Sequence, residues 1–598
     1  MRNKIFEKIP IVVPDRSGFD LSHENRGTAK IGILVPVMTR EMEGRDSLSV
    51  NLGAQIQFAP FATDFYGRVK ASFEAFFVPY RIIDGSYKSL YRNALNSLQS
   101  GSTEGEYAQI NPYFEGLIVY NLTTNGPAVD SDDPITKGDT KADPAPYEVT
   151  LDETMTADPS VGLVGPCTLL DYLGCKCEPI YDGSDYNNGS TPLYLNNRHR
   201  LDAYHRIYEE YYMDSRIQNW CYGRYRSGDV SADNDKMSQI INHRATPYNG
   251  GNKFYLIDGP LLDGTYVTGL HARNYAKDYF TTATPDPQFG GEVGVMADET
   301  GRISISQIRV GNALQQFVEL HNRIGRHYDD LAFALTGIRP SDAAVDIPVY
   351  LGRQVYDVYL KSVFQNNNSG GDVAVGFPNP FESVGSKFAN GQALGSGHLC
   401  DFTATEGGIF MVIMSVYPDA SYGTGNARQW DYSTIFDLPH PQLQGIGDQP
   451  IYKGELTNSL VSAGSAGFLR FELFDHDAVF GYTQRYAEAK FMLDETHGLL
   501  RDYQSLSAFA LKRSFDLASD VELGLDFIKV PTNALDEVSA LNTSDGGNKP
   551  FNPQSEFGYW FDLYFDVKLV SNLSAYSIPT LENMKGNTVM VDNGGRRL

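Results

Sequence analysis

The chain has 598 residues, with 49 basic and 74 acidic side chains and a net charge of −25 at neutral pH. This charge argues against extensive direct binding of nucleic acid, because Lys and Arg make most contacts with phosphate. The 57 Gly, 30 Pro, 37 Tyr and 33 Phe residues favour a mainly β protein, because aromatic side chains suit pleated surfaces and Gly and Pro end strands.

Four segments have the pattern of β-strands. Leu48–Phe58 and Trp560–Leu569 alternate apolar and polar residues, which predicts strands with one buried face. Val69–Pro79 alternates and then becomes apolar on both faces, and Ile409–Tyr417 is apolar throughout, as in a central strand covered on both sides. Because good strands lie near both ends of the chain, we expect a sandwich completed by long-range pairing, with large insertions in its loops.

Two segments have helical periodicity. Leu201–Tyr212 places Leu201, Tyr204, Tyr208 and Tyr211 on one stripe. Residues 304–335 carry apolar side chains at spacings of three and four, which predicts one inserted helix. Its start has a possible capping box in Ser304 and Gln307, and Gly337 follows its end.

Three polar stretches interrupt these elements, at residues 121–160, 223–252 and 533–556. The first is acidic and rich in Pro, and the other two are rich in Gly or Asn, so we expect surface loops. Residues 121–160 and 223–252 are the candidates for surface protrusions. The whole of residues 1–598 is predicted to form one domain with long insertions.

The cysteines indicate a protein made in a reducing cytoplasm. Their number is odd, and residues 1–14 lack the apolar region of a secretory signal. No run of about 18 apolar residues predicts a transmembrane helix. The five positions are Cys167, Cys175, Cys177, Cys221 and Cys400.

Two clusters could hold a metal or do acid–base chemistry. Cys175 and Cys177, with Cys167 upstream, could bind zinc, but a second cysteine pair is missing and we favour idle thiols. Asp475, His476 and Asp477 could form an acid–base trio, but a short charged run after Phe474 is more often a turn between strands.

No linear motif predicts an enzyme. Gly395-Ser-Gly397 and Gly423-Thr-Gly425 do not continue into phosphate-binding loops, so we expect turns there. Neither GxSxG nor a Walker loop occurs in the sequence. We therefore predict no catalytic, cofactor or metal site and no cofactor, although glycosidase carboxylates need no linear motif.

Short basic clusters lie at both ends of the chain and could face DNA, although such ends are usually just solvated. They comprise Arg2, Lys4 and Lys8 at one end and Arg596 and Arg597 at the other.

Eight blocks occur in one order between about residues 14 and 581 and resemble those of one viral family. They are Pro14–Ser17 with Leu34–Pro36 and Phe76–Arg81, Leu170–Gly174, Ala203–Asp214, Ala276–Thr281 with Pro285–Gln288, Tyr328 through Gly352, Gly407–Trp430, Gly481–Glu488, and Tyr576–Pro579. The chain resembles the major capsid proteins of the Microviridae, specifically the gokushovirus-like branch.

The resemblance implies an eight-stranded antiparallel jelly roll, the viral capsid β-sandwich, with large loop insertions that contain some helices. It implies self-assembly into a T=1 icosahedral shell that encloses a circular single-stranded DNA phage genome. Its implied partners are copies of itself, a small basic DNA-binding virion protein, a minor or pilot protein and a receptor on the bacterial surface. The DNA would be contacted mostly indirectly, and the protein would reside in the virion.

Two further hypotheses remain open. An all-β carbohydrate-binding or carbohydrate-hydrolysing protein would share the architecture by fold alone, with Asp475 and Asp477 as the first carboxylates to test. A narrower hypothesis assigns residues 121–160 to host recognition or spike formation.

Overall fold

The computed structural model describes slightly more than half of the chain. The described residues are 8–58, 61, 65–83, 117–121, 161–164, 169–175, 193–195, 199–214, 216–217, 270–290, 305–324, 328–338, 347–364, 387–457, 460–463, 470–473, 478–501, 504–513, 515, 521–531, 535, 558–575 and 586–592.

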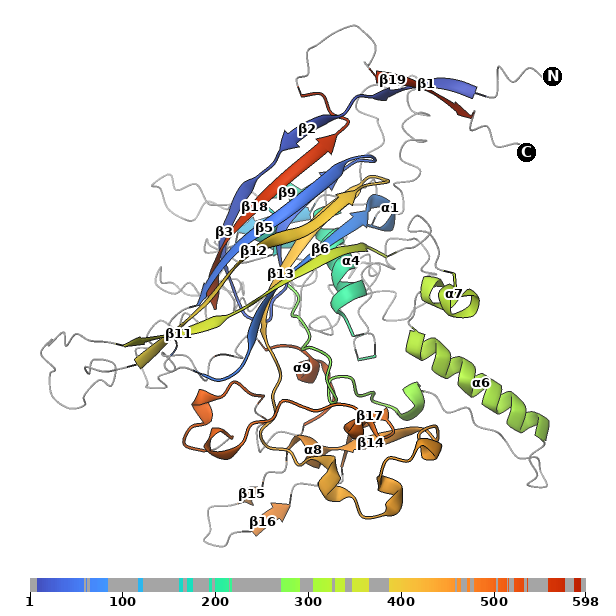
Figure 1. The fold of residues 1–598 in the computed structure, drawn as a ribbon, viewed down its shortest axis with the longest axis vertical. Coiled ribbons are helices and arrows are strands. Elements are labelled where there is room, and N and C mark those ends of the chain that lie inside the picture. Colours follow the sequence, from blue (N-terminus) through green and yellow to red (C-terminus); the bar gives the residue numbers. More distant parts are fainter. Residues whose placement is uncertain are drawn as a thin grey trace, which may run out of the picture.

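The centre of the molecule is a sandwich of two antiparallel sheets (Figure 1). The six-stranded sheet has the order β11 (Tyr359–Phe364), β12 (Lys387–Thr403), β5 (Ser47–Phe58), β18 (Tyr559–Ser571) and β2 (Ser17–Asp20), with β3 (His23–Ala29) beside the other half of β18. The four-stranded sheet has the order β10 (Val349–Asp357), β6 (Val69–Pro79), β13 (Gly408–Pro418) and β4 (Val35–Met42).

Most connections cross from one sheet to the other. If β2 and β3 are counted as one interrupted strand, and β10 and β11 as another, the chain passes between the sheets at each step except β6 to β10 and β11 to β12. β10 bonds to β6 in one sheet, and after Val358 the same strand continues as β11 and bonds to β12 in the other. This strand therefore belongs to both layers.

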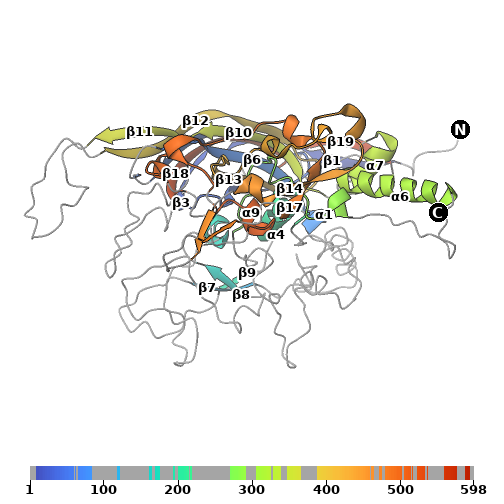
Figure 2. The same ribbon diagram turned by 90° about the horizontal axis from the view of Figure 1, so that it is seen from below.

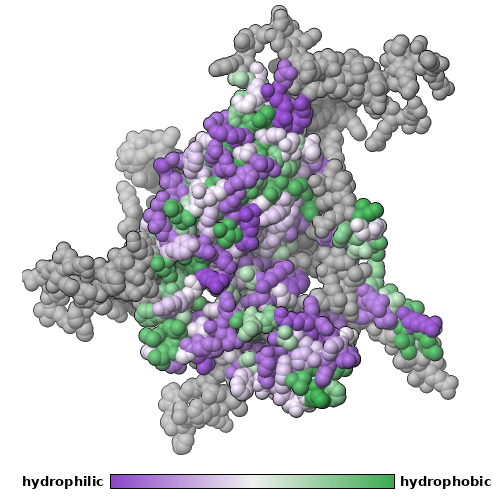
Figure 3. Space-filling view, in the orientation of Figure 1, coloured by the Kyte–Doolittle hydropathy of each residue, from purple (hydrophilic) through white to green (hydrophobic). Residues whose placement is uncertain are grey.

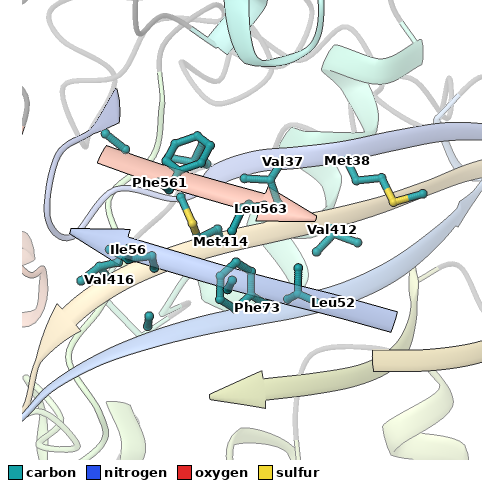
Figure 4. Close-up of a cluster of buried hydrophobic side chains, with 14 of the residues drawn as sticks. Val37, Met38, Leu52, Ile56, Phe73, Val412, Met414, Val416, Phe561 and Leu563 are labelled. Atoms are coloured by element: carbon teal, nitrogen blue, oxygen red, sulfur yellow. The ribbon is translucent and has the colours of Figure 1, made fainter. Parts of the chain in front are cut away.

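Apolar side chains from both sheets fill the space between them (Figure 4). Leu52 of β5 and Leu563 of β18 point toward Phe73 of β6 and toward Val412 and Met414 of β13. All of these side chains are almost fully buried. Their inward positions follow the period of two in the sequence, so the hydrophobic pattern fixes the register of each strand.

The outer faces of the two sheets differ. The four-stranded sheet is covered by α1 (Tyr80–Ile83), α3 (Leu169–Tyr172), α4 (His199–Ile207) and the π-helical turn η3 (Tyr208–Tyr212), which bury the second face of β6 and β13. Figure 2 shows α4 on the side away from β12. The other sheet leaves alternate residues of β18 exposed, including Tyr564.

A third apolar cluster lies at one end of the sandwich. It forms the lower lobe, by which we mean the described residues of 275–290, 420–457 and 478–530. The lobe contains η6 (Pro287–Gly290), η8 (Arg428–Asp431), η9 (Ile435–Asp437), η10 (Pro441–Leu443), β14 (Asp448–Tyr452), α8 (Lys453–Leu456), β17 (Val479–Gln484), η11 (Ala487–Ala489), η12 (Gly498–Leu500), η13 (Ser507–Phe509) and α9 (Leu525–Ile528).

The remaining elements lie around this body. β1 (Lys8–Pro14) pairs with β19 (Gly586–Asp592), and β15 (Leu460–Ala463) pairs with β16 (Arg470–Leu473). A small sheet contains β7 (Leu117–Asn121), β8 (Val161–Val164) and β9 (Leu193–Leu195), with β7 and β8 parallel. Two helices, α6 (Ile305–Ile324) and α7 (Tyr328–Thr336), project to one side in Figure 1.

The mainly β prediction is confirmed, as are the four predicted strands. β5, β6, β13 and β18 match the expected segments to within two residues at each end. β13 is buried along its whole length. The expected pairing between distant parts of the chain is also present, because β18 runs antiparallel to β5 from Tyr559 to Val570.

The helical predictions need correction. The segment predicted as one helix over 304–335 contains two, α6 and α7, and residues 325–327 and Ser304 lie outside the described part. Gly337 does end α7, with its backbone at a φ of +70°. The apolar stripe of Leu201–Tyr212 continues through Tyr212 and not Tyr211, because the bond from the Met213 amide to the Tyr208 carbonyl widens the last turn.

The predicted turn at Gly395-Ser-Gly397 is wrong, because both glycines lie within β12. A side chain at Gly395 would collide with the ring of Tyr356, and one at Gly397 would meet Gln354. The glycines therefore let β10 pack closely over β12. Gly423-Thr-Gly425 does lie in a bend.

The predicted loops fall almost wholly outside the described residues. This holds for 223–252, for 121–160 apart from Asn121, and for 533–556 apart from Leu535. The organisation of residues 1–598 as one domain with insertions stays a prediction.

Replacing Phe565 with Ala should lower the free energy of unfolding by about 3–5 kcal/mol, because it leaves a cavity between the sheets. Phe565 is fully buried and stacks on His23 with ring centroids 5.3 Å apart. Urea denaturation of unassembled subunits measures the change. Tyr564→Ala, on the exposed face of the same strand, is the control and should cost less than about 1 kcal/mol. Equal losses in both variants would contradict the assigned register of β18.

Candidate functional site

Large apolar side chains are exposed on α6 and α7. We call this the helix surface, and it comprises Ile305, Ile308, Val310, Leu314, Phe317, Phe333 and Leu335. Leu314 and Phe317 are 49% and 53% exposed, although residues three or four apart on a helix normally face a core. Figure 3 shows apolar residues on both helices. Exposed apolar side chains gathered on one element are a candidate interaction surface.

A second exposed apolar surface lies on the lower lobe. We call residues 427–446 the platform. Its apolar side chains are also largely exposed, with Trp430 at 84%, Ile435 at 65%, Phe436 at 61% and Ile446 at 65%. Figure 3 shows apolar residues gathered at the lower end of the molecule.

The platform is held rigidly despite having no long helix or strand. Its three 3₁₀ turns are closed by backbone hydrogen bonds such as Trp430 to Ala427 and Asp437 to Thr434. The Tyr486 hydroxyl donates to the Phe436 carbonyl at 2.9 Å, and the Tyr432 hydroxyl donates to Glu488 at 2.8 Å. The exposed rings are therefore carried on a fixed backbone.

A buried carboxylate anchors the start of the platform. Glu455 accepts hydrogen bonds from Arg428 at 2.9 Å, from the Tyr279 hydroxyl at 2.8 Å and from the Tyr452 amide at 3.0 Å. Burial raises the pKa of Glu455 even though Arg428 lies beside it. Losing Arg428 would leave this carboxylate without its cation in a desolvated position.

Tyr486 supports the platform in a left-handed backbone conformation, with a φ of 59°. A non-glycine residue there costs roughly 1–3 kcal/mol. The Tyr486 amide donates to the Gln449 side chain at 2.9 Å, and its hydroxyl reaches the platform. These bonds offset the strain.

Segments that form separate motifs in the sequence meet under the platform. Tyr279 and Phe280 pack with Tyr422, Phe480 and Ala487 in the core of the lower lobe. The Tyr422 hydroxyl donates to Asp278 at 2.6 Å. The sequence motifs therefore mark the support of the platform and not a catalytic cleft.

A second buried network lies on the covered face of the four-stranded sheet. Glu74 of β6 lies 3.3 Å from Arg273 and 3.1 Å from Arg353, and it accepts hydrogen bonds from Ser72 and Tyr212. Burial alone would raise the pKa of Glu74, but Arg273 and its other partners outweigh this and hold the pKa below the ordinary value of 4.5.

The same network ties several elements together. Arg273 also donates to Ser415 at 2.7 Å and lies over the ring of Tyr417 at 4.3 Å, and Arg353 donates to the Tyr417 hydroxyl at 2.6 Å. It therefore joins β6, β10, β13 and η3. Neither this network nor the platform follows from any linear motif in the sequence.

Of the candidate basic residues at the chain ends, the structure describes Lys8. Lys8 begins β1 and is paired in register with Asp592 of β19. Arg2, Lys4, Arg596 and Arg597 lie outside the described residues. The antiparallel pairing brings the two ends of the described chain to one place.

The other candidate residues from the sequence form no site among the described residues. Cys167, Cys177 and the Asp475–Asp477 run lie outside the described residues, whereas Cys175 is half-buried and Cys400 is buried. Burial raises the pKa of Cys400 to about 12. Across the described ranges, no group of three His, Cys, Asp or Glu residues could hold a metal, and none of the helices could span a membrane.

An open pocket of about 490 Å³ lies on the exposed face of the six-stranded sheet. It is lined by residues including Arg26, Gln57, Trp560 and Asp562. Arg26 pairs with Asp562 at 3.2 Å, and Trp560 donates to Gln57 at 3.0 Å, so these polar groups already bind one another.

A protein-family model described as "Capsid protein (F protein)" matches residues 8–111 and 267–581, which is more than half of the chain. The chain is 23% identical to the capsid protein VP1 of Chlamydia phage 1 over 644 aligned residues, which cover 98% of each chain.

Two further relatives align over about half of their length. The chain is 25% identical to the capsid protein VP1 of Bdellovibrio phage phiMH2K over 46% of this chain and 47% of the relative. It is 22% identical to the capsid protein VP1 of Spiroplasma virus 4 over 48% of this chain and 47% of the relative.

Replacing Glu74 with Gln should lower the free energy of unfolding by about 3–5 kcal/mol at neutral pH, because Arg273 and Arg353 lose their buried counter-charge. The pKa of Glu74 is depressed in the folded state, so its contribution is complete above 4.5 and is lost as the pH falls through the folded-state pKa. The difference between wild type and variant, measured by urea denaturation across pH, should therefore shrink on acidification.

The control is Glu24→Gln, which removes the exposed carboxylate beside Arg26 and should cost less than about 1 kcal/mol. A difference between wild type and Glu74→Gln that stays constant from neutral to acidic pH would refute the role given to the Glu74 carboxylate.

Proposed function

Because the chain belongs to the capsid protein (F protein) family of the Microviridae, we propose that it assembles into a T=1 icosahedral shell that encloses circular single-stranded DNA. It is a phage capsid protein and therefore a component of the virion, not an enzyme. The proposal concerns the geometry of the shell and its contents.

One observation supports assembly most directly: the helix surface and the platform both keep large apolar side chains substantially exposed in the described part of the chain. A soluble monomer rarely exposes contiguous apolar surface of this kind, whereas a subunit of a closed shell buries it in its neighbours. The helix surface and the platform supply such contacts.

The strand order supports the specific fold. With β2 and β3 counted as one strand, and β10 and β11 as another, the two sheets contain eight strands. The first and last of these are neighbours, because β2 and β3 both pair with β18. We infer that the sandwich is the eight-stranded jelly roll that the sequence resemblance implies. A sandwich closed by its terminal strands makes a rigid tile for a shell.

The charge of the chain bears on its contact with DNA. With a net charge of −25, the subunit would repel a polyanion unless cations intervene, so we propose that a separate small basic virion protein neutralises most of the genome. Arg2, Lys4, Lys8, Arg596 and Arg597 would add local direct contacts. A minor or pilot protein and a bacterial surface receptor complete the proposed partners, and synthesis would take place in the host cytoplasm.

The alternative of a carbohydrate-binding or carbohydrate-hydrolysing protein gains no support from the family. The pocket beside Trp560 is the described feature nearest to a sugar site, but Arg26 is paired with Asp562 and Gln57 is hydrogen-bonded to Trp560. We therefore do not propose it.

Purified chain, or particles from the phage that encodes it, should give uniform closed shells in negative-stain electron microscopy. The shells should contain nuclease-protected single-stranded DNA when they come from infected cells. A chain that stays monomeric under every condition, with no particles in the phage source, would refute the proposal.

The same particles test the basic ends, since Arg596→Gln with Arg597→Gln should reduce protected DNA and leave the shells intact.

Deleting residues 122–160 should leave particle assembly intact and abolish adsorption to the host, if this acidic stretch forms a spike or recognises a receptor. The stretch lies between the two segments that the family model matches, which supports a role outside those matched segments. Particle yield and adsorption are measured on the same preparation, and deletion of residues 223–252 provides the comparison. Loss of particles in the first deletion would show that the stretch is needed for packing.

A further inference from the structure

We propose that helix α6 of one subunit docks on the platform of a neighbouring copy of the same chain, so that adjacent subunits meet head to tail. This inference rests on the proposed function and adds to it the identity of the two surfaces in contact.

The first step concerns α6. Within residues 305–317, Gly311 is the one buried residue, and the rest of this stretch is exposed or half-buried. Val310, Leu314 and Phe317 follow one another at spacings of four and three and form one apolar stripe. Most helices in proteins gain their stability by packing an apolar face. The part of this stripe that stays exposed is therefore surface that a partner can cover.

The second step concerns the platform. Trp430, Ile435 and Phe436 are carried on a backbone that the Glu455 and Tyr486 contacts already fix. Binding would therefore order little of the platform, which reduces the entropic cost of association. Exposed Trp side chains on a rigid support are typical centres of binding energy in protein interfaces.

The third step concerns charge. Residues 305–317 contain Arg309 and no acidic residue, although the chain as a whole carries −25. The platform carries Asp431 and Asp437, and backbone hydrogen bonds from Thr434 and Ser433 hold the pKa of Asp437 below its ordinary value. Residues 305–317 thus bring a cation and no carboxylate to the platform, and Arg309 can pair with one of the two platform carboxylates.

The fourth step identifies the occupant as a second copy. Both surfaces stay exposed within one chain, so neither covers the other there. Every copy of a capsid protein supplies one helix and one platform, in equal number. Two different patches that recognise each other make a heterologous contact, which closes into rings when the rotation between subunits allows it.

Cysteines placed at Leu314 and Ile435 test this contact. Particles assembled from the double variant Leu314→Cys with Ile435→Cys should give covalent dimers and larger oligomers on mild oxidation, seen on non-reducing gels and removed by reductant. Each single variant should stay monomeric on the same gels. The matched control pairs Ile435→Cys with Leu394→Cys, a residue of β12 that is 67% exposed and outside both surfaces, and it should not cross-link.

Three outcomes would overturn the inference while leaving the shell itself established. Dimers from Leu314→Cys alone that persist when the five native cysteines are replaced with Ala would show that α6 meets α6. Cross-linking confined to one chain would show that α6 folds onto its own platform, and intact particles without any cross-link would show that the surfaces do not meet. If wild-type chain forms no particles at all, the proposed function fails, and the inference fails with it.

A charge exchange covers the case in which the cysteine variants do not assemble. Arg309→Asp should reduce particle yield at least tenfold, and adding Asp431→Arg should restore a substantial part of it. Equal yields for Arg309→Asp and wild type, or no recovery in the double variant, would contradict the pairing of these surfaces.

Discussion

Burial of apolar side chains between two sheets depends on one backbone ladder, in which β18 lies between β5 and the β2–β3 strand. The partners are separated by more than 500 residues in sequence, so the whole intervening chain must be arranged before the ladder can close. Loop-closure entropy grows only slowly with loop length, which is why the sandwich tolerates such long insertions. The apolar contact between the sheets compensates for this entropy.

Two buried carboxylates then set how the parts around the sandwich are attached. Glu74 links the covered face of the four-stranded sheet to η3 and to Arg273. Glu455 links the platform to the rest of the lower lobe. Each is paired with arginine and further hydrogen-bond donors, as a buried charge requires. The main effect of such polar networks is to fix the geometry, because their hydrogen bonds can all form in only one arrangement of the elements that they join. Rigid presentation of an exposed surface is what a repeating assembly needs.

The sequence was informative where burial has a simple period. Alternation in Leu48–Phe58 and Trp560–Leu569, and the unbroken apolar run in Ile409–Tyr417, predicted strands that the structure confirms. The sequence was misleading where a neighbouring side chain decides the role of a residue. Gly395 and Gly397 predicted a turn, but their lack of a side chain makes room for Tyr356 and Gln354 of β10, which belongs to the other sheet. The platform was not predicted, because its importance comes from exposure, which has no linear pattern. Trp430 and Tyr486 lie within family-like blocks of the sequence, but their hydrogen bonds at the platform depend on the three-dimensional structure.

The strand that continues from β10 into β11 has a mechanical consequence. It is hydrogen-bonded to β6 in one sheet and to β12 in the other. A force along this strand therefore acts on both sheets, and one sheet cannot slide over the other unless the hydrogen bonds to β6 or β12 break. β10 is also the first described strand after α7. A force applied to α6 and α7 from outside would thus be distributed over both sheets of the sandwich. A shell built from such subunits would resist internal pressure without additional stabilising contacts.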